Sequence, residues 1–320
     1  MQNNFYIYCY IILCLCFCLS LNTMPMNAQN DAYTYATIEQ HRSHQKMLST
    51  TDGNIAYIDI GQGEPILLLH GVPTSSWLYR HIINRLLKKG YRIIAPDMLG
   101  YGNSDKPKGI DLYNADQHAK RLLALMEHLN ISEWTHVLHD VGGITTWEML
   151  QIAPEKVKRL VVLNTIAYKE GFKPPMTFKR GKMMGKIYTG LYKSMARMMI
   201  KMTLNNGLCI NELSKEDCKG YWKPMKEGGN RALYTFFTSF EEIDEKLPTY
   251  QAALEQLDVP AIVIWGERDD ILVGEKQAPL VAKALKIADK DVHILKDAKH
   301  FIQEEQADEI TRLIDDLMKR

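Results

Sequence analysis

The residues that most constrain the fold of this chain are 138–143, with the sequence Leu-His-Asp-Val-Gly-Gly. The apolar run at 134–138 predicts a buried strand, and residues 144–153 have a helical pattern. A strand that enters a helix through so few residues needs a sharp turn, and the two glycines let the helix backbone pass close to the strand. Asp140 is therefore expected at the apex of the turn, with its side chain at the helix N-terminus.

A carboxylate at this apex suits a particular chemistry. An ionised Asp can displace a leaving group from a saturated carbon and so form an ester between substrate and protein. The positive end of the helix dipole favours the ionised form of Asp140. A lone Asp-x-Gly-Gly would more simply be a helix N-cap without a chemical role, so the function depends on what the rest of the chain supplies.

Length and composition limit the possible classes of protein. The 320 residues, 46% of them hydrophobic and 24% charged, are enough for one large core with an inserted subdomain. The net charge of +1 implies no general attraction to nucleic acid. The sequence has no zinc-type Cys/His spacing, no glycine-rich phosphate loop and no internal repeat. We therefore expect a small-molecule substrate and neither a metal nor another cofactor, while the oligomeric state is left open.

The first residues do not fit a globular fold. Residues 5–21 form a continuous apolar run, followed by polar residues and Met-Asn-Ala-Gln at 26–29. This predicts a signal peptide over residues 1–28, cleaved after Ala28, and export to the periplasm or the outside. No Lys or Arg precedes the run, so a retained membrane anchor is the alternative. We expect contact with a membrane only through such an uncleaved leader.

Four of the six cysteines lie in this apolar run, which leaves Cys209 and Cys218 for the mature protein. In an oxidising compartment they could form one disulfide that closes a small loop. Two unrelated thiols are an equal alternative.

Strand and helix patterns alternate along most of the chain. Residues 55–60 and 65–69, joined by Gly-Gln-Gly, predict a hairpin that leads into a buried strand. Further strands are predicted at 91–95, 134–138, 159–163, 261–265 and 292–295, with helices at 77–89, 113–129 and 303–319. Such alternation implies an α/β protein with a mostly parallel sheet flanked by helices, and a functional site at the carboxyl ends of the strands.

The alternation stops at residues 168–240, where helical stretches rich in Met, Tyr, Lys and Arg contain no convincing strand. We expect a core formed by residues 29–167 and 241–320, with a helical cap of residues 168–240 inserted into it. The basic run at 178–202 is most simply a solvated cap helix whose Met and Tyr side chains face a pocket. Attraction of an anionic substrate and contact with a membrane surface are the alternatives.

Two loops after later strands add candidate catalytic residues. An acidic pair, Asp269 and Asp270, follows the strand at 261–265, and His300 lies between the last strand and the last helix. The chain order of nucleophile, acid and histidine is that of the α/β-hydrolases. After the strand at 65–69 the backbone turns, so the N–H groups of Val72 and Val141 could bind a developing oxyanion.

Four motifs together resemble the Asp-nucleophile α/β-hydrolases, the group that contains haloalkane dehalogenases and epoxide hydrolases. They lie at residues 70–80, 96–107, 139–143 and 300–305, in the family's order and spacing. The resemblance runs from about residue 45 to the C-terminus and is weakest in the cap. The Pro-Thr-Ser-Ser segment with its following Leu-Tyr-Arg is more similar to the dehalogenases.

The resemblance implies an α/β-hydrolase fold and a role for each catalytic residue. Asp140 would be the nucleophile, His300 would activate the water that hydrolyses the ester, and Asp269 would hold His300 in the required tautomer. Asp269 rather than Asp270 fits the family's Trp-Gly-x-x-Asp spacing. Asn164 lies where some dehalogenases place the acid, but an amide cannot serve in that role.

At two positions that affect binding of the leaving group, this chain differs from typical dehalogenases. Typical dehalogenases have a Trp after the nucleophile and often an Asn or Glu after His-Gly, whereas this chain has Val141 and Val72. Loss of one transition-state donor can cost on the order of 3 kcal/mol. Three tryptophans could substitute as donors, although each is more often a packing residue; they are Trp77, Trp147 and Trp222.

Opening an epoxide instead requires an acid, and the family uses tyrosines of the cap. The candidates are Tyr168, Tyr188, Tyr192, Tyr221 and Tyr234. The usual aromatic pair late in the cap reads here as Leu-Tyr-Thr-Phe-Phe at 233–237. Tyr168 and Tyr234, with Trp77 and Trp222, are the possible contacts of the substrate or leaving group. The sequence thus predicts a haloalkane dehalogenase-like hydrolase, with epoxide hydrolysis as the alternative and a non-catalytic binding protein as a third hypothesis.

Overall fold

The computed structural model describes residues 33–209 and 213–320, which belong to one compact unit, Tyr33–Arg320. The predicted signal peptide or anchor at residues 1–28 lies outside the described residues. Within the described ranges, no helix combines the length and the hydropathy of a membrane span.

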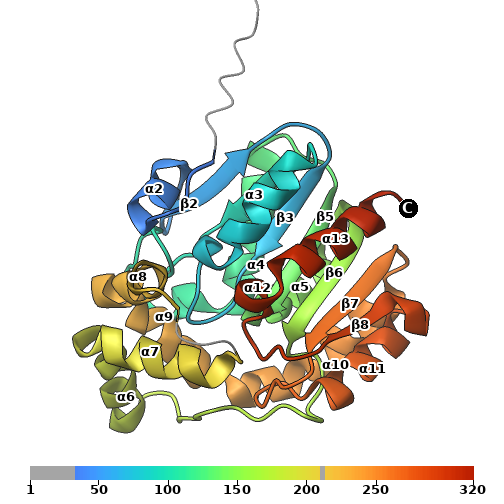
Figure 1. Ribbon diagram of the computed structural model, residues 1–320. Coiled ribbons are helices and arrows are strands. Elements are labelled where there is room, and N and C mark those ends of the chain that lie inside the picture. The colour runs from blue at the N-terminus through green and yellow to red at the C-terminus, as the bar shows by residue number, and fades with distance from the viewer. Residues whose placement is uncertain (1–32, 210–212) are drawn as a thin grey trace, which may run out of the picture. The chain divides into compact units, whose positions relative to one another are not determined.

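An eight-stranded, mostly parallel sheet forms the centre of this unit (Figure 1). In spatial order its strands are β1 (Gln45–Thr50), β2 (Gly53–Ile60), β4 (Arg92–Pro96), β3 (Pro65–Leu69), β5 (Trp134–Asp140), β6 (Val157–Thr165), β7 (Ala261–Gly266) and β8 (Val292–Leu295). The pairs β1–β2 and β2–β4 are antiparallel, and from β4 to β8 all neighbours are parallel. The carboxyl ends of β3, β5, β6 and β7 therefore meet at one edge, where the site forms.

The hairpin predicted between residues 55–60 and 65–69 is wrong. β2 pairs with β1 on one side and with β4 on the other, so β4 lies between β2 and β3. The residues Ile66, Leu67, Leu68 and Leu69 have no exposed surface. A strand that is buried on both faces is stable in the middle of a sheet, and β3 lies there between β4 and β5.

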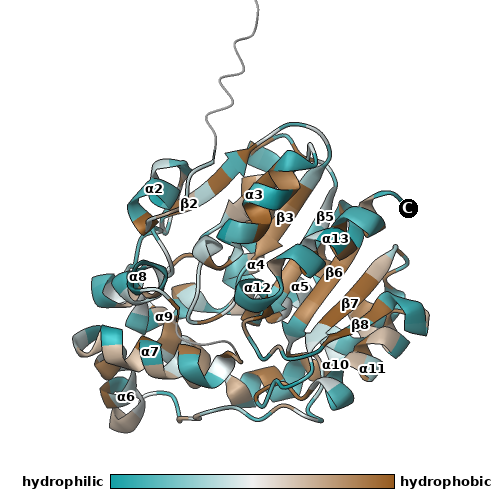
Figure 2. Cartoon of the chain, in the orientation of Figure 1, coloured by the Kyte–Doolittle hydropathy of each residue, from teal (hydrophilic) through white to brown (hydrophobic). Residues whose placement is uncertain are grey.

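Helices cover both faces of the sheet. On one face pack α3 (Arg80–Lys88), α12 (Ile302–Glu305) and α13 (Ala307–Met318). On the other face pack α4 (Ala115–His128), α5 (Val141–Ile152), α10 (Phe240–Gln256) and α11 (Gly274–Ala284). The strands of this sheet are mainly brown in Figure 2 and the helices carry more teal, as expected for a sheet enclosed by amphipathic helices.

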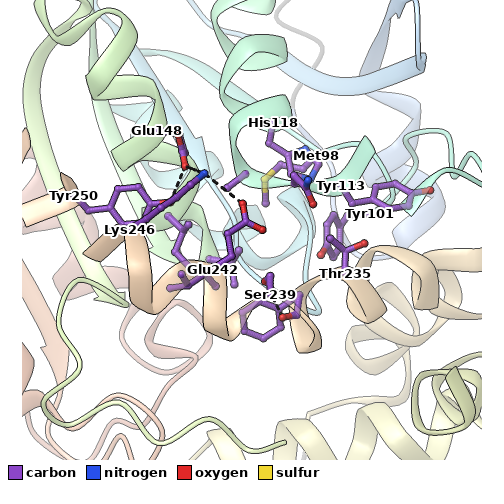
Figure 3. A pocket seen from close by; sticks show the side chains of 16 residues that line it. Met98, Tyr101, Tyr113, His118, Glu148, Thr235, Ser239, Glu242, Lys246 and Tyr250 are labelled. Atoms are coloured by element: carbon purple, nitrogen blue, oxygen red, sulfur yellow. Dashed lines mark hydrogen bonds and ion pairs between the residues drawn. The ribbon is translucent and has the colours of Figure 1, made fainter. Parts of the chain in front are cut away.

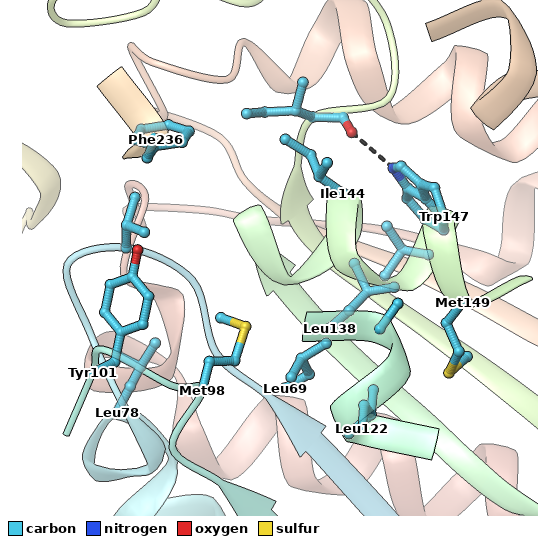
Figure 4. Packing of buried hydrophobic residues seen from close by; sticks show 14 of the residues in the cluster. Leu69, Leu78, Met98, Tyr101, Leu122, Leu138, Ile144, Trp147, Met149 and Phe236 are labelled. Atoms are coloured by element: carbon cyan, nitrogen blue, oxygen red, sulfur yellow. Dashed lines mark hydrogen bonds between the residues drawn. The ribbon is translucent and has the colours of Figure 1, made fainter. Parts of the chain in front are cut away.

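The alternation of side chains along each strand divides the core into two clusters. Ile66 and Leu68 of β3 belong to the cluster under α3 and α13, whereas Leu67 and Leu69 belong to the cluster under α4 and α5. Figure 4 shows part of this second cluster, which also contains Trp147 of α5. The indole N–H of Trp147 donates to the Ile166 carbonyl at 2.9 Å, so Trp147 is a packing residue rather than a leaving-group donor.

Between β6 and α10 the chain forms a group of helices that lies over the edge of the sheet. They are α6 (Met183–Ser194), α7 (Ala196–Gly207), α8 (Lys215–Pro224), the π-helical turn η4 (Met225–Gly229) and α9 (Asn230–Phe237). The remaining short elements are α2 (Ile38–Ser43), η1 (Ser76–Tyr79), η2 (Ile110–Tyr113), η3 (Pro154–Lys156) and η5 (Asp289–Asp291).

A buried ion-pair cluster attaches α8 to the core. Arg80 of α3, which is 1% exposed, pairs with Asp217 of α8 at 2.7 Å and donates to Glu304 of α12 at 2.8 Å. Tyr221 of α8 donates to Glu304 as well. No disulfide joins Cys209 and Cys218, so the alternative of two separate thiols holds.

Candidate active site

Asp140 occupies the sharp turn that the sequence predicts between β5 and α5. Its backbone has φ 53° and ψ −125°, and α5 begins at the next residue, Val141. A positive φ is uncommon for a residue with a side chain and marks a position where the surrounding structure holds the backbone under strain. The turn points the Asp140 carboxylate at the end of the sheet, where it is only 5% exposed.

The two glycines after Asp140 are required by close packing. A Cβ on Gly142 would lie 2.8 Å from the His70 carbonyl oxygen and 2.9 Å from that of Leu69, both on the β3 side. A Cβ on Gly143 would overlap the hydroxyl of Thr165 at the end of β6. The first turn of α5 can therefore lie between these strands only because both positions lack side chains.

Two backbone N–H groups hold the Asp140 carboxylate. The N–H of Val72 donates to Oδ1 at 2.7 Å, and the N–H of Val141 donates to the same carboxylate. These are the two amides that the sequence analysis expected at an oxyanion site. In the resting protein they donate to the carboxylate, and they are in place to stabilise negative charge that develops on this group during a reaction.

His300 connects Asp140 to Asp269. Its Nε2 lies 3.5 Å from Oδ2 of Asp140, and its Nδ1 lies 2.9 Å from Oδ2 of Asp269. The other Asp269 oxygen, Oδ1, accepts from the N–H groups of Ile271 and Leu272, both at 2.9 Å. His300 and Asp269 are each 3% exposed. The structure thus brings together the three residues that the sequence analysis proposed as catalytic, and Asp270 is exposed instead.

Asn164 has a role that sequence reasoning missed. Its side-chain N–H donates to Oδ2 of Asp269 at 2.6 Å, and its carbonyl accepts from the N–H of Gly266 at 3.2 Å. Asn164 therefore fixes the same carboxylate oxygen that faces His300. Its position after the strand at 159–163 was the available signal, but the partner could be identified only once β6 and β7 were seen to be adjacent.

His139, directly before Asp140, is a second supporting residue that sequence reasoning did not assign. Its Nε2–H donates to the backbone carbonyl of His300 at 2.9 Å, and the two imidazole rings lie 4.8 Å apart. Burial lowers the pKa of His139 to about 4. It is therefore neutral near pH 7 and holds the loop that carries His300 without adding charge to the site.

The charged side chains of the site shift one another's pKa values. Burial disfavours a charged His300, but the carboxylates of Asp269 and Asp140 outweigh it and raise its pKa to about 10. Burial likewise acts to raise the pKa values of Asp140 and Asp269, yet His300 and the N–H donors hold both below their usual value. The resting site near pH 7 therefore contains two carboxylates and one imidazolium.

A largely apolar cavity lies in front of Asp140 and His300. Its walls come from the loop after β3, from α6, α7 and α9, and from the loops after β7 and β8. Side chains with hydroxyl or amide groups are contributed by Tyr188, Tyr192, Thr203 and Asn206, and aromatic walls by Phe172, Phe236, Phe237 and Phe301. The cavity can hold a small apolar molecule against the nucleophile.

Two tryptophans proposed as leaving-group contacts lie away from this cavity. The indole N–H of Trp77 donates to the carbonyl of Asp217 at 3.1 Å, and Arg80 lies over its ring. Trp222 on α8 lies under Arg197, with the guanidinium 5.1 Å from its ring. Neither residue lines the cavity at Asp140. Both stabilise the contacts of the cap helices instead.

The two tyrosines proposed as substrate contacts are also elsewhere. Tyr168 lines a separate surface hollow beside α11. The hydroxyl of Tyr234 on α9 accepts from the N–H of Gly181 at 2.9 Å, which ties α9 to the loop before α6. Tyr188 and Tyr192 of α6, which the sequence analysis named among the cap tyrosines, line the cavity in their place.

A second, smaller cavity lies beside the first turn of α5 (Figure 3). Val141 lines this cavity and not the catalytic one, whereas Phe236 lines both. At one end Lys246 pairs with Glu148 at 2.8 Å and Glu242 at 3.4 Å. Typical dehalogenases have a Trp directly after the nucleophile. The smaller Val141 at this position leaves space on this side of α5.

The possible metal ligands in the described part of the chain do not form a binding group. Across residues 33–209 and 213–320, no three His, Cys, Asp or Glu side chains are grouped so that they could hold a metal ion.

Comparison with known proteins agrees with this geometry. The family model of the alpha/beta hydrolase fold matches residues 64–307. A haloalkane dehalogenase from Mycolicibacterium paratuberculosis is 33% identical over 270 residues, which cover 81% of this chain and 85% of that protein. A cis-3-alkyl-4-alkyloxetan-2-one decarboxylase from Shewanella oneidensis is 30% identical over 277 residues, covering 82% and 84% of the two chains.

The fold is also that of solved structures. An epoxide hydrolase from Vigna radiata has a TM-score of 0.69 at 22% identity, covering 86% of this chain and 97% of its own. The resemblance stated from the four sequence motifs is therefore confirmed, as is the expected fold class. This chain is a hydrolase that belongs to the α/β-hydrolase fold family, with haloalkane dehalogenases among its relatives.

Proposed function

We propose that this protein hydrolyses carbon–halogen bonds of small apolar substrates through an ester on Asp140. One observation carries the proposal: the Asp140 carboxylate lies at the floor of an apolar cavity with His300 3.5 Å from one oxygen and the Val72 N–H 2.7 Å from the other. A carboxylate held in this way is suited to attack a saturated carbon. The haloalkane dehalogenase relatives favour a halide as the leaving group.

The first step uses the oxygen that faces His300. Oδ2 of Asp140 forms a bond to the substrate carbon while the carbon–halogen bond breaks and the halide takes its electron pair. Oδ1, which accepts from the N–H of Val72, becomes the carbonyl oxygen of the ester. Among the residues that line the cavity, Tyr188 and Asn206 carry donors for the departing halide.

The second step needs His300 as a base. Esterification removes the charge of Asp140, which is one of the two carboxylates that raise the pKa of His300. The pKa of His300 therefore falls in the intermediate, and the imidazolium releases its proton to the solvent. The neutral ring can then take a proton from water. The hydroxide attacks the ester carbonyl, and the N–H groups of Val72 and Val141 stabilise the developing charge. The bond between Cγ and Oδ2 then breaks, His300 returns its proton to Oδ2, and the alcohol leaves with that oxygen. The new carboxyl group of Asp140 ionises and protonates His300 again.

Trapping the ester tests this proposal. We expect a His300→Gln variant to gain the mass of the alkyl group on mixing with a bromoalkane, with release of bromide, because the ester forms but is not hydrolysed. A His300→Gln/Asp140→Asn double variant is the control and should gain nothing. A folded single variant that forms no adduct with any bromoalkane or epoxide would contradict an Asp140 ester.

Epoxide hydrolysis is a second candidate, favoured by the tyrosines of α6. Tyr188 and Tyr192 both line the catalytic cavity, with ring centroids 5.7 Å apart. A phenol O–H could donate a proton to the epoxide oxygen as Asp140 opens the ring. The same His300→Gln variant distinguishes the two reactions, because an epoxide would add its whole mass and release no ion.

We further propose that the chain is exported with residues 1–28 as a signal peptide. The apolar run at 5–21 and the small residue Ala28 before the expected cut support this. Sequencing the N-terminus of the protein from the producing cell tests it. A first residue at Gln29 is the expected result, and an intact leader in a membrane fraction would favour the anchor.

A further inference from the structure

The helix pair α6–α7 of the cap exposes an unusual number of large apolar side chains. The exposed members, here called the α6–α7 face, are Met183, Met184, Ile187, Leu191, Met195, Met198 and Met202. Their exposed fractions run from 36% for Leu191 to 73% for Met183. Contiguous exposed apolar surface of this kind marks a binding site for a protein or a membrane.

The spacing of these residues places them on one side of each helix. In α6, Met183, Ile187 and Leu191 follow at intervals of one turn, and Gly185, Thr189 and Tyr192 form the buried side. In α7 the exposed Met198 and Met202 are also one turn apart. Because α6 and α7 are joined at Met195 and contact each other, the two stripes form one surface.

Basic side chains border this surface. Lys182, Lys186, Lys193, Arg197 and Lys201 are all exposed, and no Asp or Glu occurs between Glu170 and Glu212 in the sequence. Within the described residues, Lys182, Lys186 and Lys193 form no ion pair with another side chain. Figure 2 shows α6 and α7 in mixed tan and teal at the edge of the molecule.

The charge of this face decides between its possible occupants. A second copy of the chain would bring two basic surfaces together, and such like-charge contacts are unfavourable. An anionic membrane surface instead complements the charge and accepts the Met, Ile and Leu side chains among its acyl chains. Lysines can extend their ammonium groups to the headgroups while their stems remain apolar.

The catalytic cavity opens at the same helices. Met202, with 48% of its surface exposed, belongs both to the α6–α7 face and to the cavity wall. Tyr188 and Tyr192 of α6 and Asn206 of α7 also line the cavity. A surface that covers α6 and α7 would therefore also contact Met202, which lines the cavity.

We infer that the α6–α7 face docks the cap on membranes that contain anionic lipids. This contact is separate from the leader, and it develops the alternative of membrane contact that the sequence left open for the basic run at 178–202. If the proposed hydrolysis holds, the docked cavity receives apolar substrates that partition into the bilayer. The docking itself does not depend on that activity and can be tested without a substrate.

The experiment measures co-sedimentation of residues 29–320 with vesicles. This is the chain expected after cleavage, and it contains the compact unit Tyr33–Arg320 with the whole sheet. We expect binding to vesicles with about a third phosphatidylglycerol, little binding to pure phosphatidylcholine, and loss of binding at high salt. Lys182→Glu/Lys186→Glu should weaken the binding roughly 25-fold or more, from about fivefold for each lysine removed.

A matched control changes the same charge elsewhere. Lys88→Glu/Lys283→Glu alters two exposed lysines of α3 and α11, outside the α6–α7 face, and should leave the vesicle binding unchanged. Met183→Gln/Ile187→Gln should weaken it with the charge intact. Binding that the control reduces equally, or no binding by a folded protein, would overturn the proposal. So would a dimer in solution that Met183→Gln/Ile187→Gln dissociates, because the face would then join two copies.

Discussion

At the scale of single residues, Asp140 and His300 each change the chemistry of the other. The charge of Asp140 helps to raise the pKa of His300 to about 10, so the resting histidine is protonated and cannot act as a base. Ester formation removes that charge. The base thus becomes available only after the nucleophile has reacted, which orders the two steps of the proposed reaction.

Replacing Asp140 tests this coupling directly. In Asp140→Asn the neutral amide no longer stabilises the imidazolium, so we expect the pKa of His300 to fall below its wild-type value while Asp269 still keeps it from falling as far as burial alone would. NMR titration of ¹⁵N-labelled histidine measures the pKa of His300 in this variant. An unchanged His300 pKa in a folded variant would show that Asp140 does not interact with the ring.

Asn164 offers a second test at this scale. Asn164→Leu removes the N–H that donates to Asp269 Oδ2 at 2.6 Å, a hydrogen bond to a charged group. Such bonds contribute about 1.5–3 kcal/mol, so we expect ester hydrolysis to slow roughly 10- to 100-fold while alkylation of Asp140 is nearly unaffected. Rapid-quench measurement of the ester checks this. Equal slowing of both steps would point to a general loss of structure.

The catalytic residues could be predicted because they follow strands at fixed positions. Asp140, Asp269 and His300 each follow a recognisable strand, and parallel strands bring such positions to one edge. Asn164 and His139 were not assigned because their partners depend on strand neighbours and on backbone carbonyls. Trp77 was misassigned as a possible contact since its indole direction depends on how α8 packs, which no local pattern encodes.

At the scale of elements, the turn between β5 and α5 depends on the absence of side chains. Gly142→Ala would place a Cβ 2.8–2.9 Å from two backbone carbonyl oxygens. Backbone cannot move away cheaply, so we expect a loss of about 1–3 kcal/mol in the free energy of unfolding by urea. Gly190→Ala on α6, where a Cβ meets nothing within 4 Å, is the matched control. It should be neutral or stabilise by about 0.5–1 kcal/mol, and equal destabilisation of both variants would refute the packing argument.

Most helices and strands could be predicted from the sequence, but which strands lie next to each other could not always be predicted. The expected strands and the long helices of the core are present, because hydrophobic periodicity reports burial. The order β2–β4–β3 was missed because a Gly-Gln-Gly turn can reverse a chain within a sheet or carry it past another strand. Only the burial of β3 on both faces decides between these, and that is a property of the assembled sheet.

At the scale of the whole molecule, the raised pKa of His300 links stability to pH. A group whose pKa is higher in the folded state stabilises the protein below its unfolded pKa, about 6.5, and this contribution is lost as pH rises through about 10. The His300→Gln variant lacks this stabilisation because it has no imidazole. We expect the stability difference between wild type and His300→Gln in urea unfolding to be larger near pH 6 than near pH 10. A difference that grows with pH would have the wrong sign.

In the proposed reaction, the oxygen atom of the product alcohol comes from Asp140. A single turnover of excess wild-type enzyme in H₂¹⁸O measures this directly, with a bromoalkane as substrate. Because the alcohol leaves with Oδ2 of Asp140, we expect an unlabelled alcohol in the first turnover. The ¹⁸O should be in the Asp140 side chain, where mass spectrometry of the peptide that contains Asp140 detects it. An alcohol labelled in the first turnover, with no label in the protein, would mean that water attacks the substrate directly and would contradict the covalent role of Asp140.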